Sequence, residues 1–138
     1  MKDNCKLEKL KIGDKVSMKR IASHEIVCQF AEISGDKNPV HLSEEYAKTT
    51  IFGSRIAHGM FCLGMVSNLI GTQLPGEGSI LVNESVNYRK AVYLNDEIET
   101  TVEITKFIYE KNKVIMSINC YNQNGELVLD GITEVKVI

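Results

Sequence analysis

Residues 59–71 have the sequence GMFCLGMVSNLIG, and apolar side chains occupy nearly every side of the helix that this stretch predicts. A helix that is apolar all round is typical of a buried position. At about 1.5 Å per residue, the helix spans roughly 20 Å. We therefore expect a long helix, buried on all sides, at the centre of the fold.

After this helix the pattern changes to runs of β-branched and aromatic residues, which favour strands. The runs cover residues 80–92, 97–108, 113–121 and 127–137. Asn124-Gly125 separates the last two runs, and Asn-Gly is a strong turn signal for an antiparallel hairpin. The sequence thus predicts an α+β domain in which an antiparallel sheet wraps around one long central helix, which is the hot-dog arrangement.

Before the central helix, the sequence predicts a shorter helix followed by an irregular segment. Ser23 is placed to N-cap a helix whose apolar positions, from Ile26 to Ile33, follow helical spacing and end near Gly35. Turn residues and a short helix start at 43–46 then predict an irregular excursion with exposed side chains. Excursions of this length inside a small domain are often functional.

The size and charge of the chain indicate its general class. Its 138 residues are the usual size of one compact domain, so we expect a single domain over 1–138. The formal net charge of -2 arises from 16 basic and 18 acidic residues without a block of like charge, which argues against a nucleic-acid partner. The N-terminus lacks a signal-peptide pattern, and no apolar run is long enough to cross a bilayer. We expect a cytoplasmic protein without a membrane partner.

The spacing of cysteine and histidine gives no sign of a metal site. The four cysteines lie at positions 5, 28, 62 and 120, without a C-x-x-C pair. The histidines, His24, His41 and His58, are few and far apart along the chain. We therefore expect reduced, mostly packed thiols and no bound metal.

Two short motifs frame the irregular segment, DKNPVH at 36–41 and AHGM at 57–60. Together with the length between them, they resemble the MaoC-like (R)-specific enoyl-CoA hydratases, and a looser similarity extends from about Phe30 to the C-terminus. The resemblance implies the hot-dog fold and the reversible syn addition of water to a trans-2-enoyl-CoA, which gives an (R)-3-hydroxyacyl-CoA. The acyl-CoA is then the substrate, and no separate cofactor is implied. A helix covered by one sheet leaves surface to bury, so we also expect a homodimer or a higher homo-oligomer.

Asp36 and His41 are the candidate acid/base pair. They stand five residues apart across an Asn-Pro turn, which would fix their geometry. Hydration needs a group that deprotonates water at Cβ and a group that protonates Cα, and a carboxylate with an imidazole supplies both. The resemblance implies that the pair holds the catalytic water, and the assignment of the two proton transfers stays open. The alternative is structural, with Asp36 capping the next turn and His41 solvated in a loop.

Four further residues are candidates for the site. Gly59 heads the central helix, where a backbone N–H suits the developing enolate, and the resemblance assigns this role to it. The alternative for Gly59 is close packing of helix and sheet. His58 is expected to cap or brace the helix start, and Ser67 to hydrogen-bond either to the acid/base pair or to its own helix. His58, Ser67 and Asn38 are together the expected substrate-binding residues.

Two other functions are compatible with the predicted fold. Many hot-dog thioesterases place a catalytic carboxylate on the central helix, but residues 59–74 contain no Asp or Glu. A non-catalytic acyl-CoA-binding module would need no acid/base pair, whereas this sequence retains Asp36, His41 and Gly59 together. Arg89 and Lys90 either meet coenzyme A phosphates or are solvated at a strand end. The hydratase is therefore the favoured interpretation.

Overall fold

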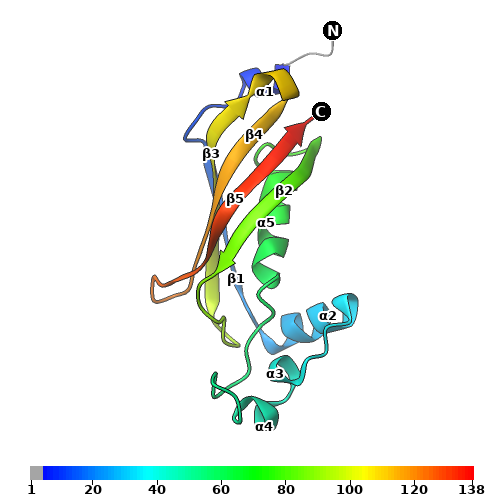
Figure 1. The fold of residues 1–138 in the computed structure, drawn as a ribbon, viewed down its shortest axis with the longest axis vertical. Helices are drawn as coiled ribbons and strands as arrows, with labels where there is room; N and C mark the ends of the chain where they lie inside the picture. The colour runs from blue at the N-terminus through cyan, green and yellow to red at the C-terminus, as the bar shows by residue number, and fades with distance from the viewer. Residues whose placement is uncertain (1–4) are drawn as a thin grey trace.

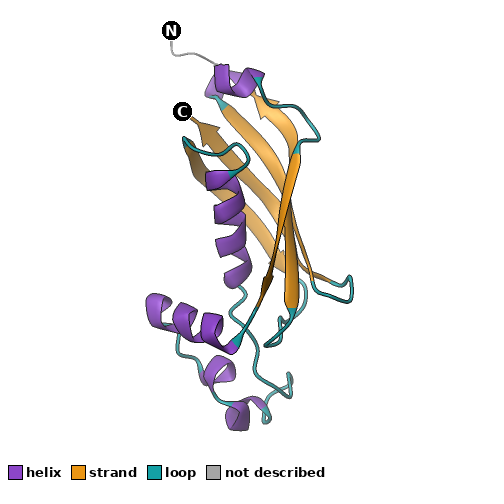
Figure 2. Ribbon diagram, turned by 180° about the vertical axis from the view of Figure 1, so that it is seen from behind, coloured by secondary structure: helices purple, strands orange, loops and turns teal. Residues whose placement is uncertain are grey.

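The computed structural model describes residues 5–138 and contains one five-stranded sheet in the order β1-β3-β4-β5-β2. The strands are β1 (Lys15–Ile21), β2 (Ser79–Tyr88), β3 (Glu97–Ile108), β4 (Lys113–Tyr121) and β5 (Leu127–Val137), and all four pairings are antiparallel. The sheet curves around helix α5 (Phe61–Thr72), which lies along its inner face (Figures 1 and 2). The predicted α+β arrangement of a sheet around one helix is confirmed.

Three of the four predicted strands have the predicted boundaries. The runs at 97–108, 113–121 and 127–137 coincide with β3, β4 and β5, and the Asn124-Gly125 turn joins the last two as a hairpin. β2 ends at Tyr88 rather than at residue 92, because the Arg89 and Lys90 amides both bond to the Val128 carbonyl oxygen and leave the ladder.

The sequence patterns do not predict β1. Its sequence is KVSMKRI, and only Val16 and Met18 pack against the core. The remaining positions are mainly polar, because β1 is an edge strand with one face toward solvent. A strand with two core contacts is held by its pairing with β3 more than by its own composition.

Helix α5 packs one side against the sheet and leaves its other side open. Its buried side chains are Phe61, Cys62, Met65, Val66, Leu69 and Ile70. On the opposite side Gly64, Ser67 and Asn68 are exposed. The prediction of a helix buried on all sides is therefore wrong for the single chain, because the sheet covers only one side of α5.

Three short helices cluster at one end of the sheet, near the start of α5 (Figure 1). They are α2 (His24–Ser34), α3 (Pro39–Leu42) and α4 (Glu44–Ala47), while α1 (Cys5–Glu8) lies at the other end. The Ser23 hydroxyl caps α2 as predicted, accepting from the Ile26 N–H at 3.2 Å. Gly35 ends the helix with a φ of 78°, a left-handed conformation that glycine adopts without strain.

The segment between α2 and α5 is more buried than predicted. The sequence patterns predict exposed side chains, yet Val40, His41, Ala47, Ala57 and His58 are all buried. Two of these residues belong to α3 and one to α4, so the segment folds into short helices that bury side chains instead of forming an exposed loop. The two motif histidines are thus part of a rigid scaffold.

One hydrophobic core joins α5 to the inner face of the sheet. The predicted domain of 1–138 includes residues 1–4, which lie outside the described part of the chain. Within residues 5–138, no helix combines the length and apolar character needed to cross a membrane. The cytoplasmic location stays a prediction.

Candidate active site

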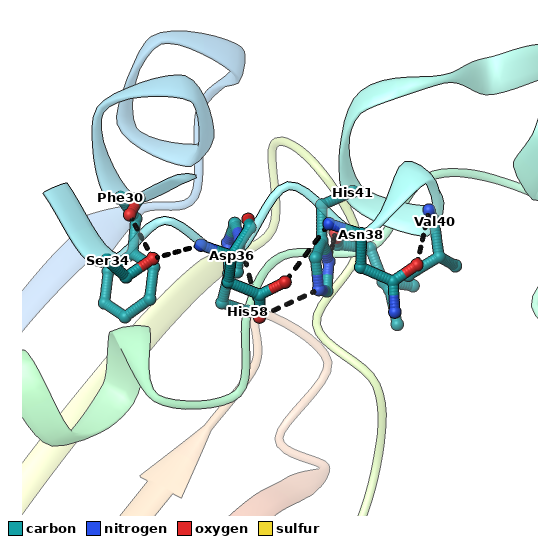
Figure 3. Close-up of polar contacts among 8 residues, drawn as sticks. Phe30, Ser34, Asp36, Asn38, Val40, His41 and His58 are labelled. Carbon is teal, nitrogen blue, oxygen red and sulfur yellow. Dashed lines mark hydrogen bonds and ion pairs between the residues drawn. The ribbon is translucent and has the colours of Figure 1, made fainter. Parts of the chain in front are cut away.

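Asp36 follows the C-terminus of α2 and is held from three directions (Figure 3). Its backbone N–H donates to the Ser34 hydroxyl at 3.1 Å, and its carbonyl oxygen accepts from His58 Nε2 at 2.9 Å. Its carboxylate oxygen Oδ1 accepts from the Asn38 N–H at 3.1 Å. The second carboxylate oxygen, Oδ2, therefore has a fixed position and remains available for chemistry.

His41 lies on α3, whose start is fixed by Asn38 and Pro39. Asn38 Oδ1 accepts from the Val40 N–H at 3.2 Å, and Pro39 occupies the first turn, where its missing N–H costs nothing. The His41 Nδ1–H donates to the Ile56 carbonyl oxygen at 2.7 Å. Because a carbonyl only accepts, Nδ1 must carry the proton, and Nε2 of the neutral ring holds the lone pair.

The carboxylate and the imidazole face each other, as predicted. Asp36 Oδ2 and His41 Nε2 are 3.9 Å apart, which is too far for a direct hydrogen bond. One water placed about 2.8 Å from each atom would make an angle of roughly 90° between them, near the angle between its own O–H bonds. His41 is only 8% exposed, so the alternative of a solvated loop histidine is wrong.

The His58 side chain lies against Asp36 and His41 rather than capping the start of α5. Its ring stacks on His41 with centroids 3.8 Å apart, and it contacts the Phe30 ring at 4.7 Å. Its Nε2–H holds the Asp36 carbonyl oxygen (Figure 3). The expected brace is therefore present, but it supports Asp36 and His41 instead of α5. Its predicted contact with substrate stays a prediction, from a side chain that is 3% exposed.

Asp36, His41 and His58 are also the candidate metal ligands in residues 5–138. One potential ligand atom of each lies within 4.8 Å of the others, although the histidines are distant in sequence. However, His58 Nε2 donates to the Asp36 carbonyl oxygen and so is not free to bind a cation. On the His58 ring only Nδ1 then keeps a lone pair, and this atom is inaccessible. Asp36 and His41 alone are fewer ligands than a protein zinc site uses. The absence of a metal stays a prediction, and this hydrogen bond supports it.

Gly59 stands two residues before the first residue of α5, where the structure shows close packing, and its role toward the enolate stays a prediction. An ideal Cβ on Gly59 would lie 2.6 Å from Cε1 of Tyr88, so any larger residue would have to displace the Tyr88 ring. Within residues 5–138, no acceptor hydrogen-bonds to the Gly59 N–H. Gly59 also lines a cavity of about 380 Å³ together with Ile56 and Cys62. The Gly59 N–H is thus without an acceptor, in a residue that lines a cavity.

The thiol beside Gly59 is not a nucleophile. Cys62 and Cys120 are buried and free, and Cys28 is free and half-buried, as expected for packed, reduced thiols. The hydrogen bond with Cys120, together with burial, raises the pKa of the Cys62 thiol far above its ordinary value. Cys62 therefore stays protonated and contributes packing rather than chemistry.

Ser67, Arg89 and Lys90 are placed differently from the acid/base pair. Ser67 is exposed on the open face of α5, and no hydrogen bond in the described chain joins its hydroxyl to Asp36 or His41. Arg89 Nε donates to Asp130 Oδ1 at 3.1 Å, and the Lys90 ammonium contacts the Glu126 carboxylate. Both cations line the Gly59 cavity, so a phosphate would compete with these carboxylates.

Glu84 on β2 is a half-buried carboxylate whose charge opposes folding. Its Oε1 is inaccessible and, within residues 5–138, has no hydrogen-bond partner. Burial raises the pKa of the Glu84 carboxyl above its ordinary value. Because the folded-state pKa exceeds the unfolded one, the native state is penalised once the pH rises above the unfolded pKa, and the penalty is absent below it.

Glu84→Gln is therefore expected to raise the free energy of unfolding at about pH 7.5 and to leave it unchanged at about pH 3.5. Urea unfolding at the two pH values measures the difference, with the exposed Glu110→Gln as the matched control. A gain of the same size at both pH values would show that the carboxylate charge is not its cause.

Several groups in the site carry no sequence signal of their own. The Ile56 acceptor is a backbone carbonyl, so side-chain identity says nothing of its role. Arg55 stands two residues before the second motif, yet nothing in its spacing from His41 predicts that their atoms meet. Ser34, beside the helix-ending Gly35, could be found from the local pattern, because serines at helix ends commonly bond to the backbone.

Comparisons with known proteins agree with this geometry. The family model described as MaoC like domain matches residues 9–124. The 3-hydroxybutyryl-CoA dehydratase of Methylorubrum extorquens is 41% identical over 130 residues, covering 94% of this chain and 82% of that protein. The (R)-specific enoyl-CoA hydratase of Rhodospirillum rubrum is 38% identical over 130 residues, covering 94% and 90%. The expected enzyme class, a hydro-lyase, is confirmed by these relatives.

A solved structure gives the same result for the fold. The (R)-hydratase from A. caviae involved in PHA biosynthesis superposes with a TM-score of 0.91 at 34% sequence identity, covering 95% of this chain and 99% of that chain. The hot-dog prediction is thereby confirmed. By its family model, its relatives and its fold, the chain belongs to the MaoC-like domain family.

Proposed function

We propose that this chain is an (R)-specific enoyl-CoA hydratase, which adds water reversibly and syn to a trans-2-enoyl-CoA to give an (R)-3-hydroxyacyl-CoA. The observation that carries the proposal is the 3.9 Å approach of Asp36 Oδ2 to His41 Nε2, the spacing that one bridging water requires. The names of the two curated relatives support the same reaction class.

The protonation of the pair supports a single water as the source of both added groups. In its neutral form His41 carries its proton on Nδ1, and Asp36 in its ionised form carries none. Neither facing atom therefore holds a proton to give at the start. The pair removes a proton from the water as the oxygen bonds to Cβ, and the same proton is then returned to Cα. Both groups arrive from one side, which makes the addition syn.

We assign two groups of the site to the charge that develops during the addition. As the water oxygen bonds to Cβ, the electrons of the double bond move to Cα and the thioester oxygen. The Gly59 N–H is the available donor for that oxygen, in a position where a helix start favours negative charge. If His41 takes the proton, the Asp36 carboxylate stabilises the resulting imidazolium.

The test is hydration of crotonyl-CoA by the purified protein. We expect the absorbance of the conjugated thioester to fall, and chiral analysis of the product to give the (R)-3-hydroxy form. An (S) product would contradict the proposal even if water were added. Release of free thiol without hydration would instead indicate a thioesterase, and binding without turnover would indicate an acyl-CoA-binding module.

We also propose that two copies of the chain pair through strand β2. This strand is an edge of the sheet, and its own residues Ile80, Leu81 and Val82 are each more than a third exposed. An unpaired apolar edge readily adds another strand, and a second copy offers the same edge. Light scattering should then give the mass of two chains, whereas the mass of one chain would contradict this pairing.

A further inference from the structure

We propose that Arg55 is a positioning residue that fixes His41 relative to Asp36, and that His24 holds Arg55 in place. The proposal rests on the proposed function, because the property that Arg55 controls is the placement of a proton-transferring imidazole. Nothing in its own position makes Arg55 a contact of the substrate, and its effect passes through His41.

The Arg55 guanidinium joins two helices of the site. Its Nε–H donates to the His41 carbonyl oxygen at 2.7 Å, and its Nη1–H donates to His24 Nδ1 at 3.0 Å. Its backbone N–H also approaches the Glu44 carboxylate, with 3.4 Å between N and Oε2. One residue thus contacts the first residue of α2, the third residue of α3 and the first residue of α4.

The anchoring matters because α3 cannot hold His41 by itself. The helix has only four residues, and a single helical turn has little stability of its own. A guanidinium at a helix C-terminus binds the carbonyls that lack intrahelical partners, and its charge complements the helix dipole. Arg55 is therefore placed to fix the backbone from which the His41 ring extends.

The contact with His24 extends this effect to Asp36. His24 begins α2, and Asp36 follows two residues after α2 ends, so both belong to one rigid segment. His24 accepts from Arg55 through Nδ1, which places the proton of the neutral ring on Nε2, 3.6 Å from Cys28 Sγ. Arg55 consequently links the segment that carries the carboxylate to the helix that carries the imidazole.

The first experiment is Arg55→Met in the hydration of crotonyl-CoA. A displacement of about 1 Å in a catalytic group can cost roughly 100-fold, so we expect kcat to fall about 10- to 100-fold. KM is expected to change less than about threefold, because Arg55 acts through His41 and does not itself bind the substrate. Arg55→Lys should recover part of the loss by restoring a donor to the His41 carbonyl oxygen.

A matched control separates this effect from the loss of a half-buried cation. Lys113 on β4 pairs with Glu134 at 3.6 Å, and its side chain is 19% exposed. Lys113→Met introduces the same side chain far from α3, and it should leave kcat unchanged. An equal loss in both variants would overturn the proposal.

The second experiment is a double-mutant cycle with His41. If Arg55 acts through His41, Arg55→Met should have no further effect on the residual hydration of the His41→Asn variant. A purely structural role would lower the activity of both backgrounds equally and would overturn the proposal. Should Arg55→Met not fold, His24→Leu takes its place in the cycle, with an expected loss of about two- to tenfold that His24→Gln, which keeps an acceptor, restores.

A nitrogen NMR measurement keeps this inference separate from the proposed function. We expect His41 to show the Nδ1–H form in the wild-type chain and a mixture of both tautomers in Arg55→Met. The variant ring is no longer held in the orientation in which Nδ1–H donates to the Ile56 carbonyl oxygen. An unchanged tautomer together with unchanged turnover overturns the role of Arg55. A changed tautomer in a chain that hydrates no enoyl-CoA overturns only the hydratase.

Discussion

Asp36→Asn is expected to lower the kcat of crotonyl-CoA hydration by about 100- to 10,000-fold while the chain keeps its fold. The amide oxygen of asparagine can still accept from the Asn38 N–H, so the turn that carries the side chain is preserved. The amide cannot take or return a proton, and in place of Oδ2 it presents either a donor or a weak acceptor. The loss should therefore appear in kcat and not in stability.

The absorbance of the conjugated thioester measures this loss, and thermal unfolding checks the fold. Glu32→Gln provides the matched control, since Glu32 lies on α2, just before Asp36, and its carboxylate is 80% exposed and pairs with Lys37 at 3.3 Å. This control should keep wild-type turnover. If Asp36→Asn also kept wild-type turnover, Asp36 could not be part of the acid/base pair.

The sequence predicted best those features that depend on neighbours in the chain. The Ser23 cap, the Gly35 helix end and the Asn124-Gly125 hairpin each follow from interactions within a few residues. The proximity of Asp36 and His41 belongs to the same class, because the Asn38 cap and the Asp36 turn are local interactions that bring position 41 back toward position 36. Such features can be predicted because the residues that determine them are close together in the sequence.

The features that the sequence did not predict depend on contacts between distant segments. The β1 strand exists through its pairing with β3, which lies more than 70 residues later in the chain. The tautomer of His41 is set by the carbonyl oxygen of Ile56, and a carbonyl has the same chemistry at every residue. The open face of α5 carries glycine and serine between apolar residues. This pattern gives no clear polar signal, so it predicts burial on all sides.

The proximity of His41 and His58 is a further feature that their spacing in the sequence does not predict. Along the chain His41 and His58 are seventeen residues apart, whereas in the fold their rings stack at 3.8 Å. Their distance in sequence favours the absence of a metal site, but the fold brings both rings to one place. What now supports a site without metal is the hydrogen bond that occupies His58 Nε2, a fact of three-dimensional structure.

His41→Asn is expected to reduce kcat to nearly the same extent as the Asp36 variant, by about 100- to 10,000-fold. The asparagine amide N–H can replace Nδ1–H as donor to the Ile56 carbonyl oxygen, so α3 should keep its packing. The asparagine side chain has no atom at the position of Nε2, so the water loses one of its two hydrogen-bond partners. Turnover at the wild-type rate would remove His41 from the pair.

His41→Gln distinguishes proton transfer from simple positioning of the water. The glutamine amide oxygen reaches the region of Nε2 and can accept a hydrogen bond from water, but it is not a base at neutral pH. If Nε2 only holds the water, glutamine should restore most of the activity that asparagine loses. If Nε2 transfers a proton, both variants should be equally impaired.

The double variant Asp36→Asn, His41→Asn tests whether the two residues act on the same water or in separate steps. Two groups that act on one water form a unit, so removal of the second should cost much less than removal of the first. We expect the double variant to have nearly the activity of either single variant, with residual rate from the Gly59 N–H and substrate binding alone. Independent losses that multiply would instead mean that Asp36 and His41 serve separate steps and share no water.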